Sequence, residues 1–169
     1  MLIKTVRGFT PQYGKNCFFA ENATLIGEVI MGDDCSVWFQ AVVRGDVNTI
    51  SMGNRVNIQD GTVIHGTFEQ SPTNIGNDVS IGHNAIVHGC SIHDRVLVGM
   101  GSIIMDDSII GSNSIIAAGS VLLKNTLVPE GSVYAGIPAR KIKEISPELQ
   151  KVEVERIAAN YIRYASWFK

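Results

Sequence analysis

The sequence predicts an all-β solenoid: a parallel β-helix of about six coils with a C-terminal α-helix. Two observations support this fold class. An aliphatic residue recurs every six positions over most of the chain, and in most repeats a small residue follows it four positions later. This hexapeptide period is typical of a parallel β-helix, in which each repeat supplies one flat face. The aliphatic positions are Phe19, Leu25, Met31, Val37, Val43, Met52, Ile58, Ile64, Ile75, Ile81, Val87, Ile92, Val98, Ile104, Ile110, Ile116, Leu122 and Val128.

The elements are expected in a simple order. Residues 1 to about 18 cap the first rung, residues 19 to about 134 form the coils, and the segment 133–142 leads out of them. We therefore expect a β-helix domain over 1–145 and a helix packed on the solenoid over 146–169. Ser146 suits the N-cap of that helix and Pro147 its first turn. Its apolar positions at helical spacing are Leu149, Val152, Ala158, Tyr161, Ile162, Ala165 and Phe168.

Composition narrows the function classes. The chain has 169 residues, a net charge of −2 and 45% hydrophobic residues, so it offers no basic footprint for nucleic acid. No apolar run reaches the roughly 18 residues that cross a membrane, and no signal peptide is visible. Three cysteines, an odd number, favour a reducing, cytoplasmic location. Cys35 fits an interior repeat position and Cys90 a packing role.

Three of the four histidines fall between residues 65 and 88. If three hexapeptides make one coil, residues three repeats apart stack about 4.8 Å from one another. Arg44, His65 and His88 then form one column, while His83 lies on a neighbouring face above Asp60. Chains packed around a three-fold axis would bring His83 of one chain to His65 and His88 of another. Three imidazoles with an open fourth position are the pattern of a catalytic zinc site.

Interruptions of the repeat lie beside this column. Extra residues follow Val43 and Ile64, the second insertion forming the loop 66–74, and one residue is missing after Val87. Solenoids carry insertions on the face where they work. The remaining histidine, His93, is expected on the surface.

Four segments resemble one family. They are VVRGDVNTI (42–50), NIQDGTVIH (57–65), IGHNAIVHGC (81–90) and VLVGMGSIIMD (96–106). Together they resemble the γ-class carbonic anhydrases of the hexapeptide-repeat superfamily. The resemblance implies a left-handed β-helix, a homotrimer, and a metal ion at each subunit interface. Its ligands would be His65, His83 and His88, with His83 donated across the interface. The metal would be Zn²⁺, with Fe²⁺ and Co²⁺ as alternatives that accept three imidazoles.

The resemblance also implies roles for other residues. Arg44 and Asp46 match interface positions, and Gln59 and Asp60 match positions beside the metal. Arg44 would attract an anion such as bicarbonate, and Gln59 would orient the metal-bound hydroxide. A purely structural salt bridge between Arg44 and Asp60 is the alternative. Tyr161, or as second choice Tyr164, would approach the site from the C-terminal helix.

One position departs from the family. Val47 stands where the archetypal enzyme has a glutamate that carries protons, and the loop holds only Glu69. The sequence therefore predicts metal-dependent, reversible hydration of CO2 to bicarbonate with low turnover. The alternatives are a hexapeptide-repeat acyl-CoA transferase or thioesterase, and a non-catalytic, metal-stabilised trimeric scaffold.

Overall fold

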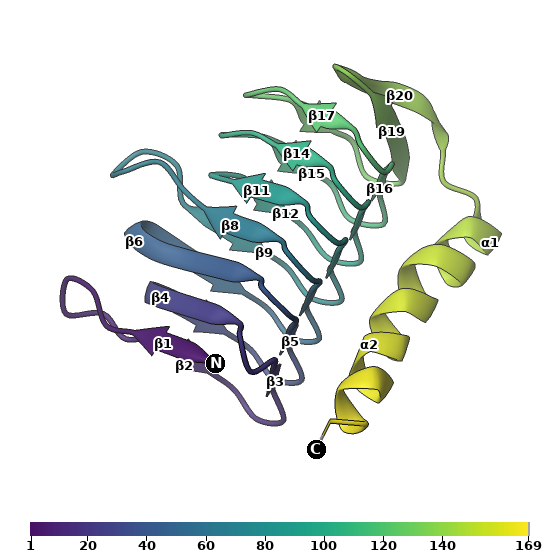
Figure 1. The fold of residues 1–169 in the computed structure, drawn as a ribbon. Coiled ribbons are helices and arrows are strands. Elements are labelled where there is room, and N and C mark those ends of the chain that lie inside the picture. The colour runs from purple at the N-terminus through teal and green to yellow at the C-terminus, as the bar shows by residue number, and fades with distance from the viewer. Residues whose placement is uncertain (169) are drawn as a thin grey trace.

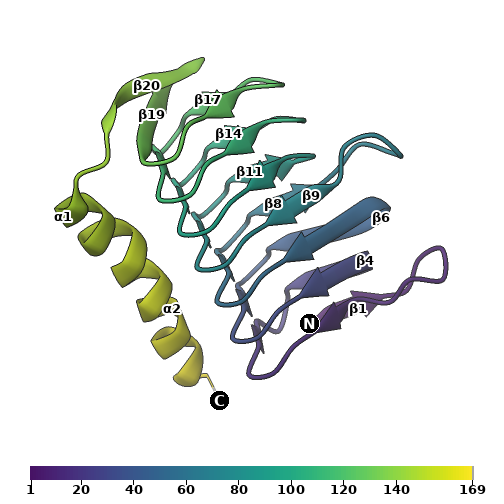
Figure 2. The ribbon, with the colours of Figure 1, turned by 180° about the vertical axis from the view of Figure 1, so that it is seen from behind.

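The computed structural model describes residues 1–168 and confirms the left-handed parallel β-helix, followed by a helical segment (Figures 1 and 2). Each of its three faces holds seven parallel strands, so the solenoid has about seven turns. The expectation of about six was one too few. The N-terminal segment does more than cap, because β1 (Leu2–Lys4) and β2 (Gln12–Tyr13) pair in parallel with β4 (Thr24–Met31).

The strands of a face stack in register from turn to turn. Face A contains β1, β4, β6 (Val42–Met52), β8 (Val63–His65), β11 (Ile86–His88), β14 (Ile103–Ile104) and β17 (Val121–Leu122). Face B contains β2, the second halves of β4 and β6, β9 (Thr73–Ile75), β12 (Ser91–Ile92), β15 (Ile109–Ile110) and β18 (Leu127–Val128). Face C contains β3 (Phe18–Phe19), β5 (Ser36–Val37), β7 (Asn57–Ile58), β10 (Ser80–Ile81), β13 (Leu97–Val98), β16 (Ile115–Ile116) and β19 (Ser132–Gly136), with β20 (Ala139–Glu144) antiparallel to β19.

The core is the stack of repeating aliphatic side chains. Every predicted repeat position from Leu25 to Val128 is buried, and most are completely inaccessible. Phe19 is only half-buried, because it belongs to the open first turn of face C, where Phe18 is buried instead. The interior is continuous along the solenoid, so a residue's turn and face fix its neighbours.

The C-terminal segment lies along face C (Figure 1). It consists of α1 (Pro147–Leu149), a π-helical stretch η1 (Gln150–Glu155) and α2 (Arg156–Ser166). Ser146 is the N-cap, as expected, and its hydroxyl accepts a hydrogen bond from the Leu149 amide at 3.1 Å. No helix among residues 1–168 has the length and apolarity to cross a bilayer.

The predicted apolar stripe of this helix is partly wrong. Val154, Ala158 and Ala165 are buried, whereas Val152 and Ile162 are exposed. The wider π-helical turn rotates the buried face relative to regular α-helical spacing. Phe168 remains largely exposed but packs its ring on Phe18 and Trp38, with ring centroids 5.3 and 5.6 Å apart.

Candidate metal centre

Two histidines end adjacent strands of face A. His65 and His88 are register partners on β8 and β11, which is the stacking that the hexapeptide count predicts. His65 Nδ1 lies 3.3 Å from His88 Nε2. A tetrahedral ion with metal–nitrogen distances of about 2.0–2.1 Å holds its nitrogen ligands about 3.3–3.4 Å apart. The two facing nitrogens therefore fit two corners of one tetrahedral metal site.

Each of these rings holds a carboxylate on its other nitrogen. His65 Nε2 lies 3.0 Å from Asp46 Oδ1, and His88 Nδ1 lies 2.5 Å from Asp106 Oδ1. Metal-ligating histidines commonly carry such a partner, which fixes the ring's tautomer and orientation. Burial lowers the pKa of His65 despite the nearby Asp46 carboxylate. A lowered pKa favours the neutral imidazole, the form that binds metals.

Asp106 is a site residue that the sequence reasoning missed. It follows Met105, which lies one coil above His88 in the same column. Its other oxygen accepts a hydrogen bond from Thr67 Oγ1 at 2.8 Å. Gly89 makes room for it, because a Cβ at Gly89 would lie only 2.2 Å from Asp106 Oδ1. Extending the hexapeptide count one coil beyond His88 reaches Met105, and the next residue is Asp106, so the same count could have identified this carboxylate.

Arg44 extends the histidine column by one coil, as predicted. Val43 and Ile64 are register partners, and Arg44 and His65 follow them. The Arg44 guanidinium lies 2.6 Å from Asp46 Oδ2, so Asp46 bridges Arg44 and His65. Although burial acts in the opposite direction, hydrogen bonds from Arg44 and His65 hold the pKa of Asp46 below its usual value. The carboxylate stays ionised between the two.

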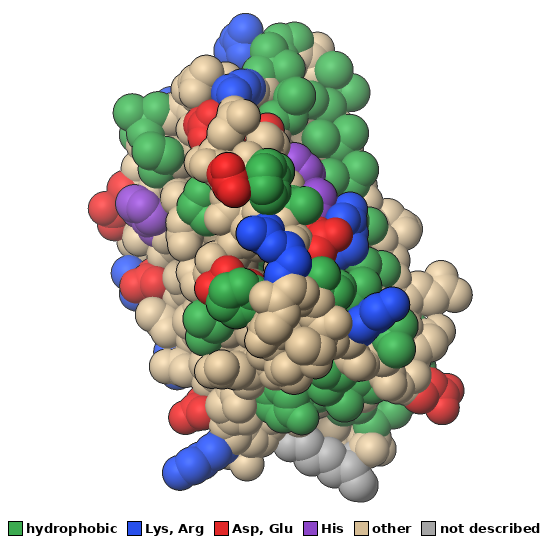
Figure 3. All heavy atoms as spheres, turned by 90° about the vertical axis from the view of Figure 1, so that its left-hand side faces the viewer, with side chains coloured by type: hydrophobic (Ala, Val, Ile, Leu, Met, Phe, Trp, Pro, Cys, Tyr) green, Lys and Arg blue, Asp and Glu red, His purple; other side chains and the backbone are tan. Residues whose placement is uncertain are grey.

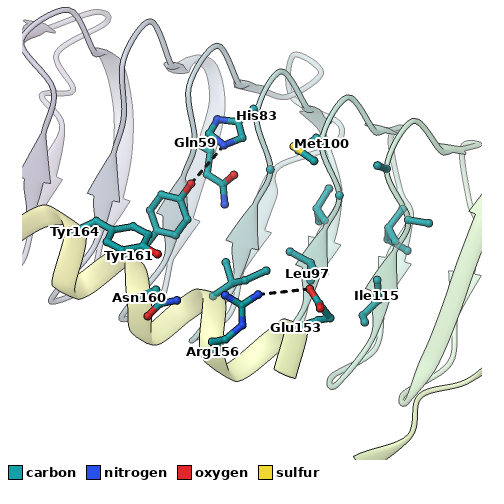
Figure 4. A pocket seen from close by; sticks show the side chains of 17 residues that line it. Gln59, His83, Leu97, Met100, Ile115, Glu153, Arg156, Asn160, Tyr161 and Tyr164 are labelled. Carbon is teal, nitrogen blue, oxygen red and sulfur yellow. Dashed lines mark hydrogen bonds and ion pairs between the residues drawn. The ribbon is translucent and has the colours of Figure 1, made fainter. Parts of the chain in front are cut away.

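His83 occupies a different corner, in the turn between β10 on face C and β11 on face A. Its Nδ1 lies 2.9 Å from Asp60 Oδ2, which is its predicted column partner. Nε2 lies 3.5 Å from the Tyr161 hydroxyl, at the outer limit of a hydrogen bond. Burial and the Asp60 charge raise the pKa of Tyr161 to about 12. Figure 4 shows Tyr161 reaching His83 from α2, whereas Tyr164 packs against the rings of Tyr161 and Trp167.

Gln59 lies beside His83, and both line a groove of about 370 Å³ between face C and the C-terminal helix (Figure 4). The side chain is buried, with 5% of its surface exposed. Its amide donates to Asn57 Oδ1 at 3.0 Å, and Asn57 in turn donates to Ser80 Oγ at 2.7 Å. This buried chain of hydrogen bonds fixes the orientation of the Gln59 amide.

The other residues singled out from the sequence make no hydrogen bond or ion pair with the side chains of the three histidines. Val47 and Glu69 line a small cavity of about 210 Å³ together with Asp46. His93 is exposed, as expected, and Cys35 and Cys90 are buried. Within residues 1–168 of one chain, no group of three or more histidine, cysteine or acidic side chains is arranged to hold a metal ion. One chain offers two facing imidazoles, and the third points elsewhere.

The surface next to His65 and His88 is apolar. The outward side chains of face A form an exposed ladder beside the histidine column, made of Val63, Ile86, Ile103, Met105 and Leu123. Figure 3 shows histidine side chains next to charged groups and a long run of hydrophobic side chains along one edge of the molecule. Contiguous exposed apolar surface of this kind marks interaction sites.

Fold and site together define a class: hexapeptide-repeat β-helix proteins with paired histidines at an edge of one face. Sequence comparison agrees. Residues 89–124 match the bacterial transferase hexapeptide family (six repeats), and residues 72–105 match the hexapeptide repeat of succinyl-transferase.

Relatives define the family more narrowly. The chain is 41% identical to protein YrdA of Escherichia coli, over 96% of this chain and 91% of that one. It is 42% identical to a carbonic anhydrase of Geobacillus kaustophilus, over 99% and 91% of the two chains. A solved hexapeptide transferase family protein of Anaplasma phagocytophilum superposes with a TM-score of 0.91 at 34% identity, covering 99% and 98%. The chain belongs to the γ-carbonic-anhydrase-like family of hexapeptide-repeat proteins.

Proposed function

We propose that this protein catalyses the metal-dependent, reversible hydration of CO2 to bicarbonate, as a homotrimer with a metal site between neighbouring chains. One observation carries the proposal. Each of His65, His83 and His88 keeps one ring nitrogen against a carboxylate and turns the other away from it. Three imidazoles oriented in this way suit a shared metal.

The sequence spacing supports a shared site. His83 precedes His88 by five residues and follows His65 by 18. Along a solenoid, position on the axis increases with residue number, so His83 lies at a height between the other two. A three-fold axis parallel to the solenoid preserves these heights. It can therefore bring His83 of one chain between His65 and His88 of its neighbour, and the apolar ladder of face A supplies the contact surface.

The metal we propose is Zn²⁺, with Fe²⁺ and Co²⁺ as the other ions that three imidazoles accept. Such an ion supplies Lewis-acid activation of water near neutral pH. The chain's own groups do the rest. Asp46, Asp60 and Asp106 hold the imidazole rings in position, and the buried Gln59 amide orients a hydrogen-bonding partner beside His83.

Arg44 and Tyr161 complete the proposed site. The partly exposed Arg44 guanidinium presents positive charge where bicarbonate forms and leaves. The Tyr161 hydroxyl stays protonated, because its pKa is raised to about 12, and can donate a hydrogen bond beside His83. Relatives named carbonic anhydrase support this chemistry.

The test is stopped-flow CO2 hydration with protein whose bound metal is quantified. We expect hydration that scales with metal content and is lost in His65→Ala, His83→Ala and His88→Ala. We expect a low rate, because Val47 offers no carboxylate for proton export. Fully metallated trimer with no hydration above background in any buffer would overturn the proposal.

Acyl transfer from coenzyme A is the second candidate. The matches to transferase hexapeptide repeats and the solved hexapeptide transferase relative favour it. A transferase needs a single basic histidine and a cleft for the pantetheine arm, and gains nothing from three imidazoles with carboxylate partners. Acetyl-CoA turnover that is independent of metal would favour this candidate, whereas a trimer with neither activity would favour a scaffold.

A cytoplasmic location is part of the proposal. Cys17, Cys35 and Cys90 are free thiols, which agrees with a reducing compartment.

A further inference from the structure

Two of the three cysteines are stacked on successive turns of the solenoid. Cys17 lies between β2 and β3, and Cys35 lies between β4 and β5, so both stand at the corner between faces B and C. Each precedes one member of the register pair Phe18–Ser36. Neighbouring strands of a sheet lie about 4.8 Å apart, and a disulfide needs Cα atoms about 4.4–6.8 Å apart. The backbone spacing therefore suits a covalent link between these two residues.

The two side chains lie in one column. Cys17 Sγ lies 3.3 Å from Gly32 O, and Cys35 Sγ lies 3.2 Å from Gly53 O. Gly32 stands three residues before Cys35, so the Cys17 sulfur reaches the turn that carries Cys35. This corner is remote from the histidines, which stand at the two ends of face A. The cysteine pair is therefore separate from the proposed metal site.

The two thiols differ in exposure and in acidity. Cys17 is only partly buried, because β3 is the first strand of face C and no turn lies below it, whereas Cys35 is 1% exposed. A hydrogen bond with the Cys35 side chain lowers the pKa of Cys17 to about 7, although burial acts in the opposite direction. The same contact and burial raise the pKa of Cys35. Cys17 therefore supplies the nucleophilic thiolate near neutral pH.

Cys90 provides an internal comparison. Thr73 and Ser108 occupy the positions below and above it, so it has no cysteine neighbour in its column. It is 1% exposed, and burial raises its pKa to about 12. Cys90 should therefore stay reduced under conditions that oxidise a stacked, partly exposed pair.

We propose that Cys17 and Cys35 form a hydroperoxide-sensitive pair that closes to a disulfide and fastens the first turn of the solenoid to the second. With hydrogen peroxide, the Cys17 thiolate attacks one oxygen, the O–O bond breaks, and hydroxide leaves with the electron pair, which gives sulfenic acid at Cys17. The Cys35 sulfur then attacks the Cys17 sulfur, the S–O bond breaks, and the leaving hydroxide takes the Cys35 proton as water. Two thiols and one peroxide thus give one disulfide and two waters.

The first step prepares the second. The negative charge of Cys17 is one of the causes that raise the pKa of Cys35, and a neutral sulfenic acid removes that charge. Cys35 therefore becomes a better nucleophile only after Cys17 has reacted. The disulfide can be reduced again by thiols, as expected of a redox-sensing bond in a reducing compartment.

The link would restrain the least supported turn. End turns of a solenoid contact a neighbour on one side only, so they open most easily. Phe18 directly follows Cys17 and packs on Trp38 and Phe168, with ring centroids 4.9 and 5.3 Å apart. A bond at Cys17 would therefore also hold the aromatic contacts between the first turn and the end of the C-terminal segment.

The pair is tested by treating the wild-type protein with hydrogen peroxide, alkylating it under denaturing conditions and mapping its peptides. We expect a Cys17–Cys35 disulfide within one chain, formed at least about tenfold faster than Cys90 is oxidised. Dithiothreitol should restore both thiols. Cys17 oxidised to sulfinic acid while Cys35 stays a thiol would overturn the proposal. A disulfide between chains, or oxidation of Cys17 no faster than that of Cys90, would also overturn it.

Serine variants separate the two steps. In Cys35→Ser, the sulfenic acid at Cys17 has no thiol to resolve it and should accumulate a dimedone adduct, whereas Cys17→Ser should leave Cys35 unmodified. Serine suits this column, because the Ser114 hydroxyl donates to Pro129 O at 3.2 Å, the bond equivalent to that from Cys35 to Gly53. Equal dimedone labelling of the wild type and Cys35→Ser would show that no disulfide forms and would overturn the proposal.

Hydrogen exchange measures the fastening of the first turn. Amides of residues 1–19 should exchange at least about fivefold more slowly in the disulfide-bonded protein than in the reduced protein, because the link opposes local opening. Cys17→Ser protein given the same peroxide treatment is the control and should show no change. Unchanged exchange over residues 1–19 in fully disulfide-bonded protein would contradict the fastening.

Discussion

The two ends of face A differ in how well they are prepared for a metal. At one end, His65 and His88 face each other at 3.3 Å, and each ring is held by a partly buried carboxylate. At the other end, His83 is 39% exposed and pairs with an equally accessible Asp60. Contacts within one chain fix the orientations of His65 and His88. Among these groups, His83 contacts only Asp60 and, at 3.5 Å, the Tyr161 hydroxyl from the C-terminal helix. In the proposed trimer the two ends meet between neighbouring chains, which would tie metal binding to assembly.

The largest expected effect comes from disturbing the end of face A that holds His65 and His88. Gly89→Ala would set a Cβ 2.2 Å from Asp106 Oδ1, at a residue with φ +54°. The left-handed conformation and the forced repacking together should lower the free energy of unfolding by about 2–4 kcal/mol. Urea unfolding measures this change.

Gly101→Ala is the matched control. Gly101 also has positive φ, at +67°, but nothing lies within 4 Å of an added Cβ. It should cost only the conformational strain of about 1–2 kcal/mol. Equal losses in the two variants would mean that the Asp106 contact does not constrain residue 89.

Asp106→Asn tests the carboxylate itself. An amide still accepts a hydrogen bond from His88 Nδ1, but it cannot stabilise the positive charge that the imidazole acquires on binding a cation. Metal affinity should fall about 10- to 100-fold with the trimer intact. Competition with a chelator measures this affinity. An affinity equal to wild type would remove Asp106 from the site.

These residues also show how far the sequence could predict the site. The hexapeptide count predicts the His65–His88 and Asp60–His83 neighbours because strand register in a solenoid is set by the period. The count missed Asp106, because this residue lies in the turn after Met105 and not in the histidine column. Its carboxylate reaches His88 from one coil above, next to Gly89, whose φ is +54°. Irregular backbone limited the prediction elsewhere too. The π-helical stretch η1 shifts the buried face of the C-terminal segment, and the hexapeptide repeat is imperfect in the first turn of the solenoid.

Low pH should first reduce the stability contributed by His65. Burial lowers the pKa of His65 below its ordinary 6.5, so the unfolded chain binds its proton more readily. The stability contributed by neutral His65 is complete above about pH 6.5 and declines as pH falls below it. Asp46, whose pKa lies below 3.8, keeps its contribution until pH falls through that range.

Thermal unfolding of metal-free wild type and His65→Gln protein between pH 8 and pH 5 checks this assignment. The wild-type melting temperature should fall more steeply below pH 6.5 than that of the variant. Parallel curves would show that His65 does not carry the pH dependence.

The smallest expected effect concerns proton export. Val47 shares a cavity with Asp46 and Glu69, so Val47→Glu would add a carboxylate near Asp46, which contacts His65. We expect a rise of about two- to fivefold in the hydration rate at low buffer, since general acid–base groups contribute mainly where proton transfer limits turnover. Imidazole buffers should raise the wild-type rate more than that of the variant. A wild-type rate insensitive to buffer would mean that proton export is not limiting.

The central claim is that each metal site combines two ends from different chains, and mixed trimers test it most directly. His83→Ala chains and His65→Ala chains each lack one half of every site. Unfolded together and refolded as a mixture, they should form trimers in which some interfaces hold an intact His65, His88 and His83, and bound metal should return to those trimers. Mixed trimers that assemble fully but bind no more metal than either parent would contradict the claim.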